Sequence, residues 1–331
     1  MKPRVLVTRE ISAEAITRLK AHFTVLANQN DDPVSPQQLL QKLKGVHGAV
    51  TLTTDVINDD VLAKNPQLKI VSNVAVGYNN LDVAAATRRG VMMTNTPGAV
   101  DDATADLTWA LILATARGLT FADRSVRAGK WKRWRMMEFL GQDVYGKTIG
   151  VIGFGRIGRG VARRAMGFNM KVLYANRSRA SDAIEQEFRA SYVDKDTLLR
   201  ESDVVTLHLP LFPETRHYIG GRELALMKKT AILVNASRGP VVDEKALVKA
   251  LKAKRIAAAG LDVYEQEPAL SPGLAQLPNI VLTPHVGSGT YETRLKMSNM
   301  AVTNCIAGLT GQRPPNLLNP EVLTTRAPLS V

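Results

Sequence analysis

The chain has 331 residues, enough for two domains, and its 45% hydrophobic and 22% charged content is typical of proteins with packed cores. Its formal net charge of +13 comes from scattered Lys and Arg without a nucleic-acid-binding pattern, so we expect a basic surface that attracts anionic ligands. A single cysteine, Cys305, excludes an internal disulfide, and no apolar run predicts a signal peptide or a membrane span; we therefore expect a cytoplasmic protein.

The first part of the chain alternates strand and helix patterns. Ser35-Pro36-Gln37-Gln38 has the spacing of a capping box with proline at the first helical position, which predicts a helix start. Strands are expected at residues 5–8, 24–27, 49–53, 70–74 and 91–94, and further helices at 12–23, 58–63 and 82–89. This rhythm predicts a parallel sheet covered by helices.

A polar turn, NVAVGYNN at residues 73–80, follows one of these expected strands. Open α/β sheets bind ligands at the ends of strands, and successive backbone N–H groups around a glycine can bind an anion. A simple strand-to-helix turn has the same pattern, so the stretch alone leaves both interpretations open.

The middle of the chain departs from this rhythm. Residues 101–118 predict a long helix, and residues 95–98 before it resemble a hinge. Residues 119–146 are basic, carry Trp131 and Trp134, and have no clear periodicity. Long loops in compact proteins are usually functional or at an interface. We interpret this one mainly as a subunit contact, with its tryptophans near a neighbour's active site as a second hypothesis.

Residues 147–179 combine strand, glycine turn, helix and strand, the context that a dinucleotide fingerprint requires. The expected strands are 148–152 and 171–175, and the helix is 157–168. Gly153 allows the sharp turn, Gly155 leaves room for a pyrophosphate, and Gly158 lets the helix pack closely on the strand. The helix N-terminus offers N–H groups to the phosphates.

The end of the second strand favours NADP over NAD. NAD-binding domains usually place an acidic residue there to bind the ribose 2′-OH, whereas this chain has Asn176-Arg177-Ser178-Arg179. An acid would repel a 2′-phosphate, and a guanidinium group can bind it bidentately. Ordinary surface arginines would give the same pattern.

The alternation resumes after the fingerprint. Strands are expected at 204–209, 231–235, 258–263 and 280–283, and helices at 196–200, 222–227, 244–254 and 290–307. We expect the last helix to return to the first sheet. The first domain then comprises residues 1–99 and 288–331, and the dinucleotide-binding domain comprises residues 100–287.

Several residues that could take part in binding or catalysis lie at or just after the ends of these strands: Leu209, Pro210, Arg238, Asp262 and His285. The ends of parallel strands share one edge of the sheet, so we expect these residues to converge. His285 suits general acid–base catalysis, and Arg238 could hold a carboxylate and polarise a carbonyl.

The other histidines are weaker candidates than His285. His22, His47 and His217 lie in polar settings, and His208 is expected inside a strand as a packed core residue. Upstream of His285, Glu265 and Glu267 could each orient its ring, and the residues alone do not separate them.

Six stretches, VAVGYN, GVIGFGRIG, HLPLFPETRHYI, VNASRGPVVDE, GLDVYEQEP and LTPHVGSGT, resemble D-isomer-specific 2-hydroxyacid dehydrogenases. The resemblance covers essentially the whole chain and is strongest to glyoxylate/hydroxypyruvate and 2-ketogluconate reductases. It implies two doubly wound parallel-sheet α/β domains, a flavodoxin-like substrate domain and a Rossmann nucleotide-binding domain, with a cleft between them. It also implies a homodimer.

The resemblance further implies a role for each matching residue. Arg238, Glu267 and His285 would be catalytic, and Val76 and Gly77 would bind the substrate carboxylate through their N–H groups, with Arg238 and His285 also contacting the substrate. Besides the three glycines and Asn176, Arg177 and Ser178, the cofactor would contact Thr104, Arg156, Ile157, Leu209, Pro210, Ala236, Asp262 and Gly287.

We therefore expect NADPH-dependent reduction of a small 2-oxoacid to a D-2-hydroxyacid, with His285 as the general acid. The sequence does not choose between glyoxylate, hydroxypyruvate and 2-ketogluconate, and it predicts no metal site. Phosphonate-oxidising relatives carry lysine where this chain has Val76, so phosphite is not an expected substrate. A nucleotide-sensing corepressor, known from one branch of the family, is the alternative from another class. Nucleic-acid binding through the net positive charge is a third possibility.

Overall fold

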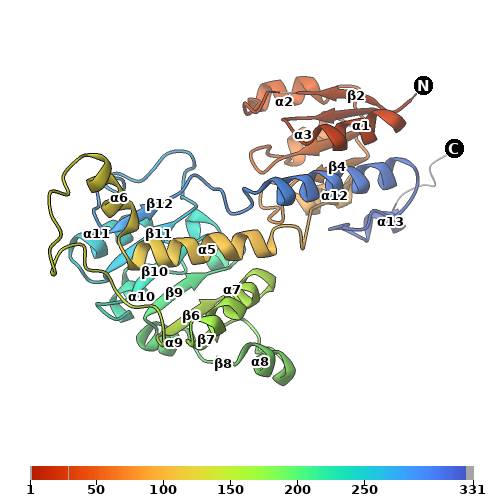
Figure 1. Cartoon of the computed structure of the whole chain (residues 1–331). Helices are drawn as coiled ribbons and strands as arrows, with labels where there is room; N and C mark the ends of the chain where they lie inside the picture. Colours follow the sequence, from red (N-terminus) through yellow and green to blue (C-terminus); the bar gives the residue numbers. More distant parts are fainter. Residues whose placement is uncertain (1, 29, 326–331) are drawn as a thin grey trace. The chain divides into compact units, whose positions relative to one another are not determined.

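The computed structural model describes residues 2–28 and 30–325 and divides the chain into two compact units (Figure 1). Unit 1 comprises Met1–Val100 and Ser288–Val331, and unit 2 comprises Asp101–Gly287, so the first junction falls one residue later than expected. Each unit contains one sheet in which every strand pairing is parallel. The predicted class of two parallel-sheet α/β domains is confirmed.

Unit 1 has a five-stranded sheet in the order β2-β1-β3-β4-β5, which is the flavodoxin-like order. Its strands are β1 (Arg4–Val7), β2 (Thr24–Ala27), β3 (Gly48–Thr51), β4 (Ile70–Asn73) and β5 (Met92–Thr94). Its helices are α1 (Ala13–His22), α2 (Pro36–Lys42), α3 (Asp59–Ala63), α4 (Val83–Arg88), α12 (Tyr291–Leu309) and α13 (Val322–Thr325).

The expected helix starts in unit 1 are confirmed. The Ser12 hydroxyl caps α1 by accepting from the Ala15 N–H, and Ser35 and Gln38 form the capping box of α2. Helix α12 returns to the first sheet, where it packs on β3, β4, β5 and α1. Gly308 permits this approach, because a Cβ atom there would lie 2.5 Å from the Cδ1 atom of Ile70.

Unit 2 has a seven-stranded sheet in the order β12-β11-β10-β9-β6-β7-β8. The strands are added on one side of β6 up to β8 and on its other side from β9 onward, so the strand order reverses between β6 and β9. Its strands are β6 (Thr148–Ile152), β7 (Lys171–Ala175), β8 (Ala190–Tyr192), β9 (Val204–Leu207), β10 (Ile232–Asn235), β11 (Ala258–Leu261) and β12 (Ile280–Leu282). Its α-helices are α5 (Asp101–Ala116), α6 (Leu119–Arg127), α7 (Arg156–Gly167), α8 (Asp182–Phe188), α9 (Lys195–Glu201), α10 (Gly221–Leu226) and α11 (Glu244–Lys252).

The seven-stranded sheet is buried on both faces. Because successive side chains of a strand point to opposite faces, Ile232 and Val234 of β10 pack in the cluster with α5 and α7. Leu233 between them packs in the cluster with α9, α10 and α11. Continuous apolar strands of this kind are typical of parallel sheets covered by helices on both sides.

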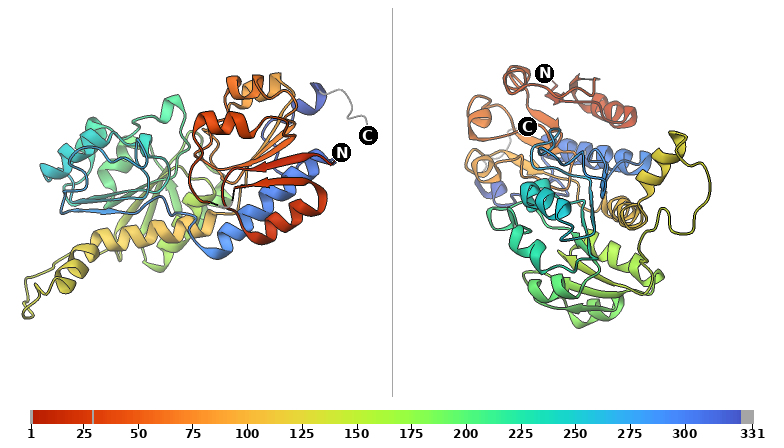
Figure 2. Two further views of the ribbon diagram at one scale, coloured as in Figure 1. Left: turned by 90° about the horizontal axis from the view of Figure 1, so that it is seen from above. Right: turned by 90° about the vertical axis from the view of Figure 1, so that its left-hand side faces the viewer.

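The structure corrects the sequence predictions at three places in unit 2. Strand β9 ends at Leu207, so His208 lies directly after it rather than inside it. Helix α8 and strand β8 were not predicted. Residues 119–127, expected to be irregular, form α6, and α6 and the loop after it project away from the sheet (Figure 2).

Within the described ranges, no helix is long and apolar enough to cross a membrane.

Candidate active site

The glycine turn between β6 and α7 has the geometry that a dinucleotide needs. Gly153 has φ +93°, and a Cβ atom there would lie 2.5 Å from the carbonyl oxygen of His208. A Cβ atom at Gly158 would lie 2.2 Å from the carbonyl oxygen of Gly153. Around Gly155, in contrast, there is open space, and no side chain caps α7. Close packing at two glycines and space at the third fit a pyrophosphate at the helix N-terminus.

The two arginines after β7, Arg177 and Arg179, differ in their hydrogen-bond partners. Arg179 forms a bidentate pair with Glu185, with Nε–Oε1 and Nη2–Oε2 distances of 2.9 and 2.7 Å. This pairing, with a hydrogen bond from the Tyr174 hydroxyl, lowers the pKa of Glu185 to about 2. Arg177 is exposed and makes no hydrogen bond or ion pair to the described residues. Arg177 is therefore the guanidinium group in this turn that remains available to an anion.

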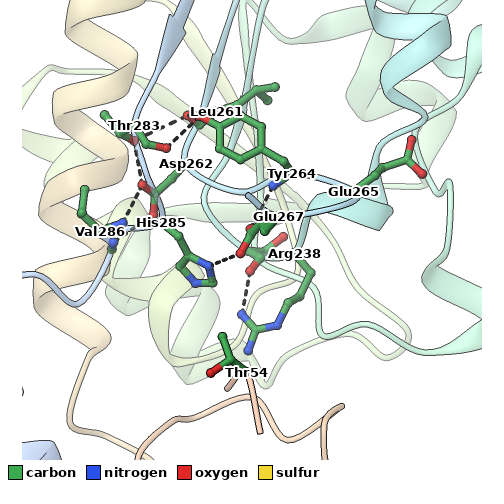
Figure 3. A network of polar contacts seen from close by, with 12 residues as sticks. Thr54, Arg238, Leu261, Asp262, Tyr264, Glu265, Glu267, Thr283, His285 and Val286 are labelled. Atoms are coloured by element: carbon green, nitrogen blue, oxygen red, sulfur yellow. Dashed lines mark hydrogen bonds and ion pairs between the residues drawn. The ribbon is translucent and has the colours of Figure 1, made fainter. Parts of the chain in front are cut away.

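His285 and Glu267 form a close pair after β12 and β11 (Figure 3). The Nδ1 atom of His285 lies 2.7 Å from Oε2 of Glu267, whose Oε1 accepts from the Tyr264 N–H at 3.0 Å. Burial raises the pKa of Glu267, but the hydrogen bond and the electrostatic interaction with His285 outweigh burial, so the net pKa is below its ordinary value. The Nε2 atom of His285 makes no hydrogen bond within the described residues, which leaves it available to a ligand.

Glu265, which the sequence did not separate from Glu267, points elsewhere (Figure 3). Its Oε2 lies 2.9 Å from Nε2 of His217, and its Oε1 accepts from the Glu244 N–H at 2.9 Å. Buried Glu244 accepts in turn from the Glu265 N–H at 2.7 Å. Glu265 therefore ties its loop to the start of α11 and does not contact the His285 ring.

Arg238 lies after β10, beside Glu267 (Figure 3). Burial lowers the pKa of Arg238, and the negative charge of Glu267 opposes this effect. A Cβ atom at Gly239 would lie 1.8 Å from the carbonyl carbon of Tyr264, so the two loops pack backbone against backbone. This contact holds the backbone after Arg238 against the loop that carries Glu267.

Asp262, which is 1% exposed, organises the loop that carries His285. Its carboxylate accepts from the Thr283 hydroxyl at 2.7 Å, the Val286 N–H at 2.8 Å and the Gly287 N–H at 2.9 Å. Burial raises the pKa of Asp262 above its ordinary value, although these hydrogen bonds act in the opposite direction. The His285 N–H also donates to the Asp262 carbonyl at 2.8 Å, with His285 at φ +53°. Asp262 thereby fixes the backbone from which the imidazole extends.

The remaining residues predicted to contact the cofactor lie at or close to the same edge of the sheet in unit 2. Thr104 is buried in α5, and its hydroxyl donates to the Gly287 carbonyl at 3.2 Å. Arg156 and Ile157 begin α7, Leu209 and Pro210 follow β9, Ala236 follows β10, and Asn176 and Ser178 share an exposed turn after β7. No cluster of three or more metal-binding side chains occurs in the part of the chain that the structure describes.

In unit 1, Val76 and Gly77 are half-buried in the loop after β4. Their N–H groups donate to no acceptor among the described residues, so both can receive an anion. Sequence reasoning missed the residues that shape the two loop systems, namely Gly239 and Tyr264 in unit 2 and Asn73 and Asn95 in unit 1. A glycine directly after a strand-end arginine was the one available signal, because such glycines often mark a close backbone approach.

Comparisons with known proteins agree with this geometry. The family described as "D-isomer specific 2-hydroxyacid dehydrogenase, NAD binding domain" matches residues 109–287. A glyoxylate reductase of Thermococcus kodakarensis is 51% identical over 332 residues, covering 99% of each chain. One of Thermococcus litoralis is 48% identical, covering 99% of this chain and 100% of the relative.

Solved structures show the same relationship. A glyoxylate reductase from Paecilomyes thermophila has a TM-score of 0.87 and 34% identity, covering 97% of this chain and 99% of that chain. An NADPH-dependent glyoxylate/hydroxypyruvate reductase from Sinorhizobium meliloti, in complex with NADP and malonate, has a TM-score of 0.85 and 30% identity, covering 97% and 98%.

The fold and the site together define a dinucleotide-dependent oxidoreductase. The chain belongs to the D-isomer-specific 2-hydroxyacid dehydrogenase family, and unit 2 contains the NAD-binding domain of that family.

Proposed function

We propose that the protein reduces glyoxylate to glycolate and hydroxypyruvate to D-glycerate with NADPH, and that 2-ketogluconate is a third candidate substrate. The pair of His285 and Glu267, 2.7 Å apart and beside Arg238, carries this proposal. Relatives named glyoxylate reductase support the substrate class. We do not propose phosphite as a substrate, because the side chain of Val76 has no positive charge with which to bind it.

Each residue has a distinct part in the proposed reaction. The N–H groups of Val76 and Gly77 bind the substrate carboxylate with help from Arg238, which also polarises the 2-oxo carbonyl group. When bound, the nicotinamide supplies the hydride. His285, charged in its pair with Glu267, transfers the Nε2 proton to the alkoxide oxygen. Glu267 holds the ring and stabilises its imidazolium form.

Initial rates with glyoxylate, hydroxypyruvate and 2-ketogluconate test the reaction class directly. We expect NADPH oxidation with at least one of them. No oxidation with any of the three would contradict the proposal and favour a nucleotide-sensing binding protein, which a peptide pull-down would then test.

The choice of NADP over NAD predicts a specific role for Arg177. A charge-assisted hydrogen bond to the 2′-phosphate would be lost in Arg177→Ala, so KM for NADPH should rise about 10- to 100-fold. KM for NADH should change little, because NADH lacks that phosphate. Arg163→Ala is the matched control, since it removes an exposed arginine that is paired with Glu187 on the surface of the same unit. Equal effects on both cofactors, or a preference for NADH in the unchanged protein, would contradict the role of Arg177.

We also propose that the protein is a homodimer and that α6 and the following loop form the subunit contact. Trp134 is 72% and Met137 78% exposed in a segment with several other exposed apolar side chains. A segment with many large, exposed apolar side chains is a candidate interaction site.

Replacing exposed apolar residues of this segment with charged ones should separate the subunits. Sedimentation velocity of the double variant Trp134→Glu/Met137→Glu should show a monomer where the unchanged protein is a dimer. Tyr291→Glu, at an exposed apolar residue of unit 1, is the control and should remain dimeric. A double variant that still sediments as a dimer would place the contact elsewhere.

A further inference from the structure

We infer that Asn95 is a positioning residue that fixes the orientation of the carboxylate-binding peptides at Val76 and Gly77. The inference concerns unit 1 alone and rests on the function proposed above. Asn95 lies outside this loop and is not one of the three residues proposed to be catalytic.

The carbonyl groups of this loop have defined partners. The Ala75 carbonyl accepts from the Thr96 N–H at 2.9 Å, and the Val76 carbonyl accepts from Nδ2 of Asn95 at 2.8 Å. A trans peptide directs its N–H and C=O groups to opposite sides. The N–H groups of Val76 and Gly77 therefore both point away from Asn95 and Thr96, toward the side left open for an anion.

The topology explains why Asn95 reaches this loop. Strands β4 and β5 are parallel neighbours with Ser72 opposite Thr94, so the segments that follow them leave the sheet at the same edge. Asn95 is 7% exposed, and its carbonyl accepts from Nδ2 of buried Asn304 on α12 at 3.2 Å. The backbone of Asn95 is thus held in place by α12, from the opposite end of the chain.

Asn73 holds the next peptide of the loop. Its Nδ2 donates to the Gly77 carbonyl at 3.3 Å, and its Oδ1 accepts from the Thr51 hydroxyl at 3.2 Å. The carbonyl groups of Ala75, Val76 and Gly77 therefore each accept a hydrogen bond, so the peptide between Val76 and Gly77 is restrained together with the peptides before and after it. Rotating it would turn a carbonyl oxygen toward the substrate carboxylate, replacing a hydrogen bond with repulsion between two oxygens.

Two variants isolate the contribution of Asn95. Asn95→Ala removes the donor, and Asn95→Asp keeps the shape but places an acceptor opposite the Val76 carbonyl. We expect KM for glyoxylate to rise about tenfold or more in Asn95→Ala, and further in Asn95→Asp. In both variants kcat should change less than about threefold, and KM for NADPH should be unchanged, because Asn95 acts on the carboxylate site. The Kd of oxamate, an unreactive carboxylate measured by calorimetry on NADPH-saturated protein, should rise in parallel.

Asn319→Ala separates positioning from simple stabilisation. Buried Asn319 accepts from the Met93 N–H and donates to the Val91 carbonyl, both at 2.9 Å, so it supports the same β5 region by the same kind of bonds. We expect this variant to lower Tm but to leave KM and the oxamate Kd unchanged. Asn95 variants with unchanged KM and oxamate Kd, or an Asn319 variant with an equal rise in KM, would overturn the inference. Absence of glyoxylate turnover in the unchanged protein would instead contradict the proposed function, and oxamate binding would still test Asn95.

Discussion

Replacing His285 with Ala should lower kcat for glyoxylate reduction by about 10²- to 10⁴-fold, the usual contribution of a general acid. The imidazole is held through Nδ1 by Glu267 at 2.7 Å, so its Nε2 atom is the proton donor in the proposed reaction. The Kd of NADPH, measured by fluorescence titration, should change little, because the glycine turn and Arg177 are untouched.

His217→Ala is a matched control for this experiment. His217 also pairs with a glutamate, at 2.9 Å from Glu265, but that pair lies apart from Arg238 and Glu267. The His217→Ala variant should keep a kcat close to that of the unchanged protein. If His285→Ala kept its kcat, or if the two histidine variants lost activity equally, the assignment of the proton donor would be wrong.

Replacing Arg238 with Lys should lower kcat/KM for glyoxylate by about 10²- to 10³-fold, comparable to the loss of one donor that stabilises a developing oxyanion. Lysine keeps the positive charge but loses the planar pair of donors that can contact a carboxylate and a carbonyl together. The close packing of Gly239 on Tyr264 leaves the loop little freedom to bring a shorter side chain into place. Steady-state rates over a range of glyoxylate concentrations measure the effect.

Arg216→Lys provides the comparison for Arg238. Arg216 is an exposed arginine whose Nη2 atom lies 3.8 Å from Oε2 of Glu265. Exposed ion pairs contribute little, so the Arg216→Lys variant should have the same kcat/KM for glyoxylate as the unchanged protein. An Arg238→Lys variant with kcat/KM close to that of the unchanged protein would show that charge alone suffices. The two-point contact proposed for the guanidinium group would then be excluded.

Local patterns predicted most of the fold because most elements carry their own signals. The glycine turn directly follows the strongly apolar strand β6 and precedes α7, and Ser12 and Ser35 mark helix starts with their side chains. The missed elements lack such signals. Ser181 precedes α8 without capping it through its side chain, and β8 is a three-residue edge strand with two exposed side chains. The large apolar side chains of α6 face solvent, so they form no stripe toward a core of this chain.

The sequence could place the candidate site at the strand ends but could not resolve its contacts. Arg238 and His285 follow from parallel topology, because residues after neighbouring strands share one edge. The separation of Glu267 from Glu265 depends on how the loop after β11 packs against Gly239, which no local pattern encodes. The direction of the Val76 and Gly77 N–H groups likewise depends on Asn95, which lies on another strand connection.

The decisive experiment on the proposed function is the reduction of hydroxypyruvate by the purified protein, with chiral analysis of the product. One NADPH and one proton should be consumed for each glycerate formed, and the glycerate should be the D-isomer. This outcome would establish the reaction, the cofactor and the stereochemistry in a single assay. Formation of L-glycerate, or no NADPH consumption with either hydroxypyruvate or glyoxylate, would contradict the proposed function.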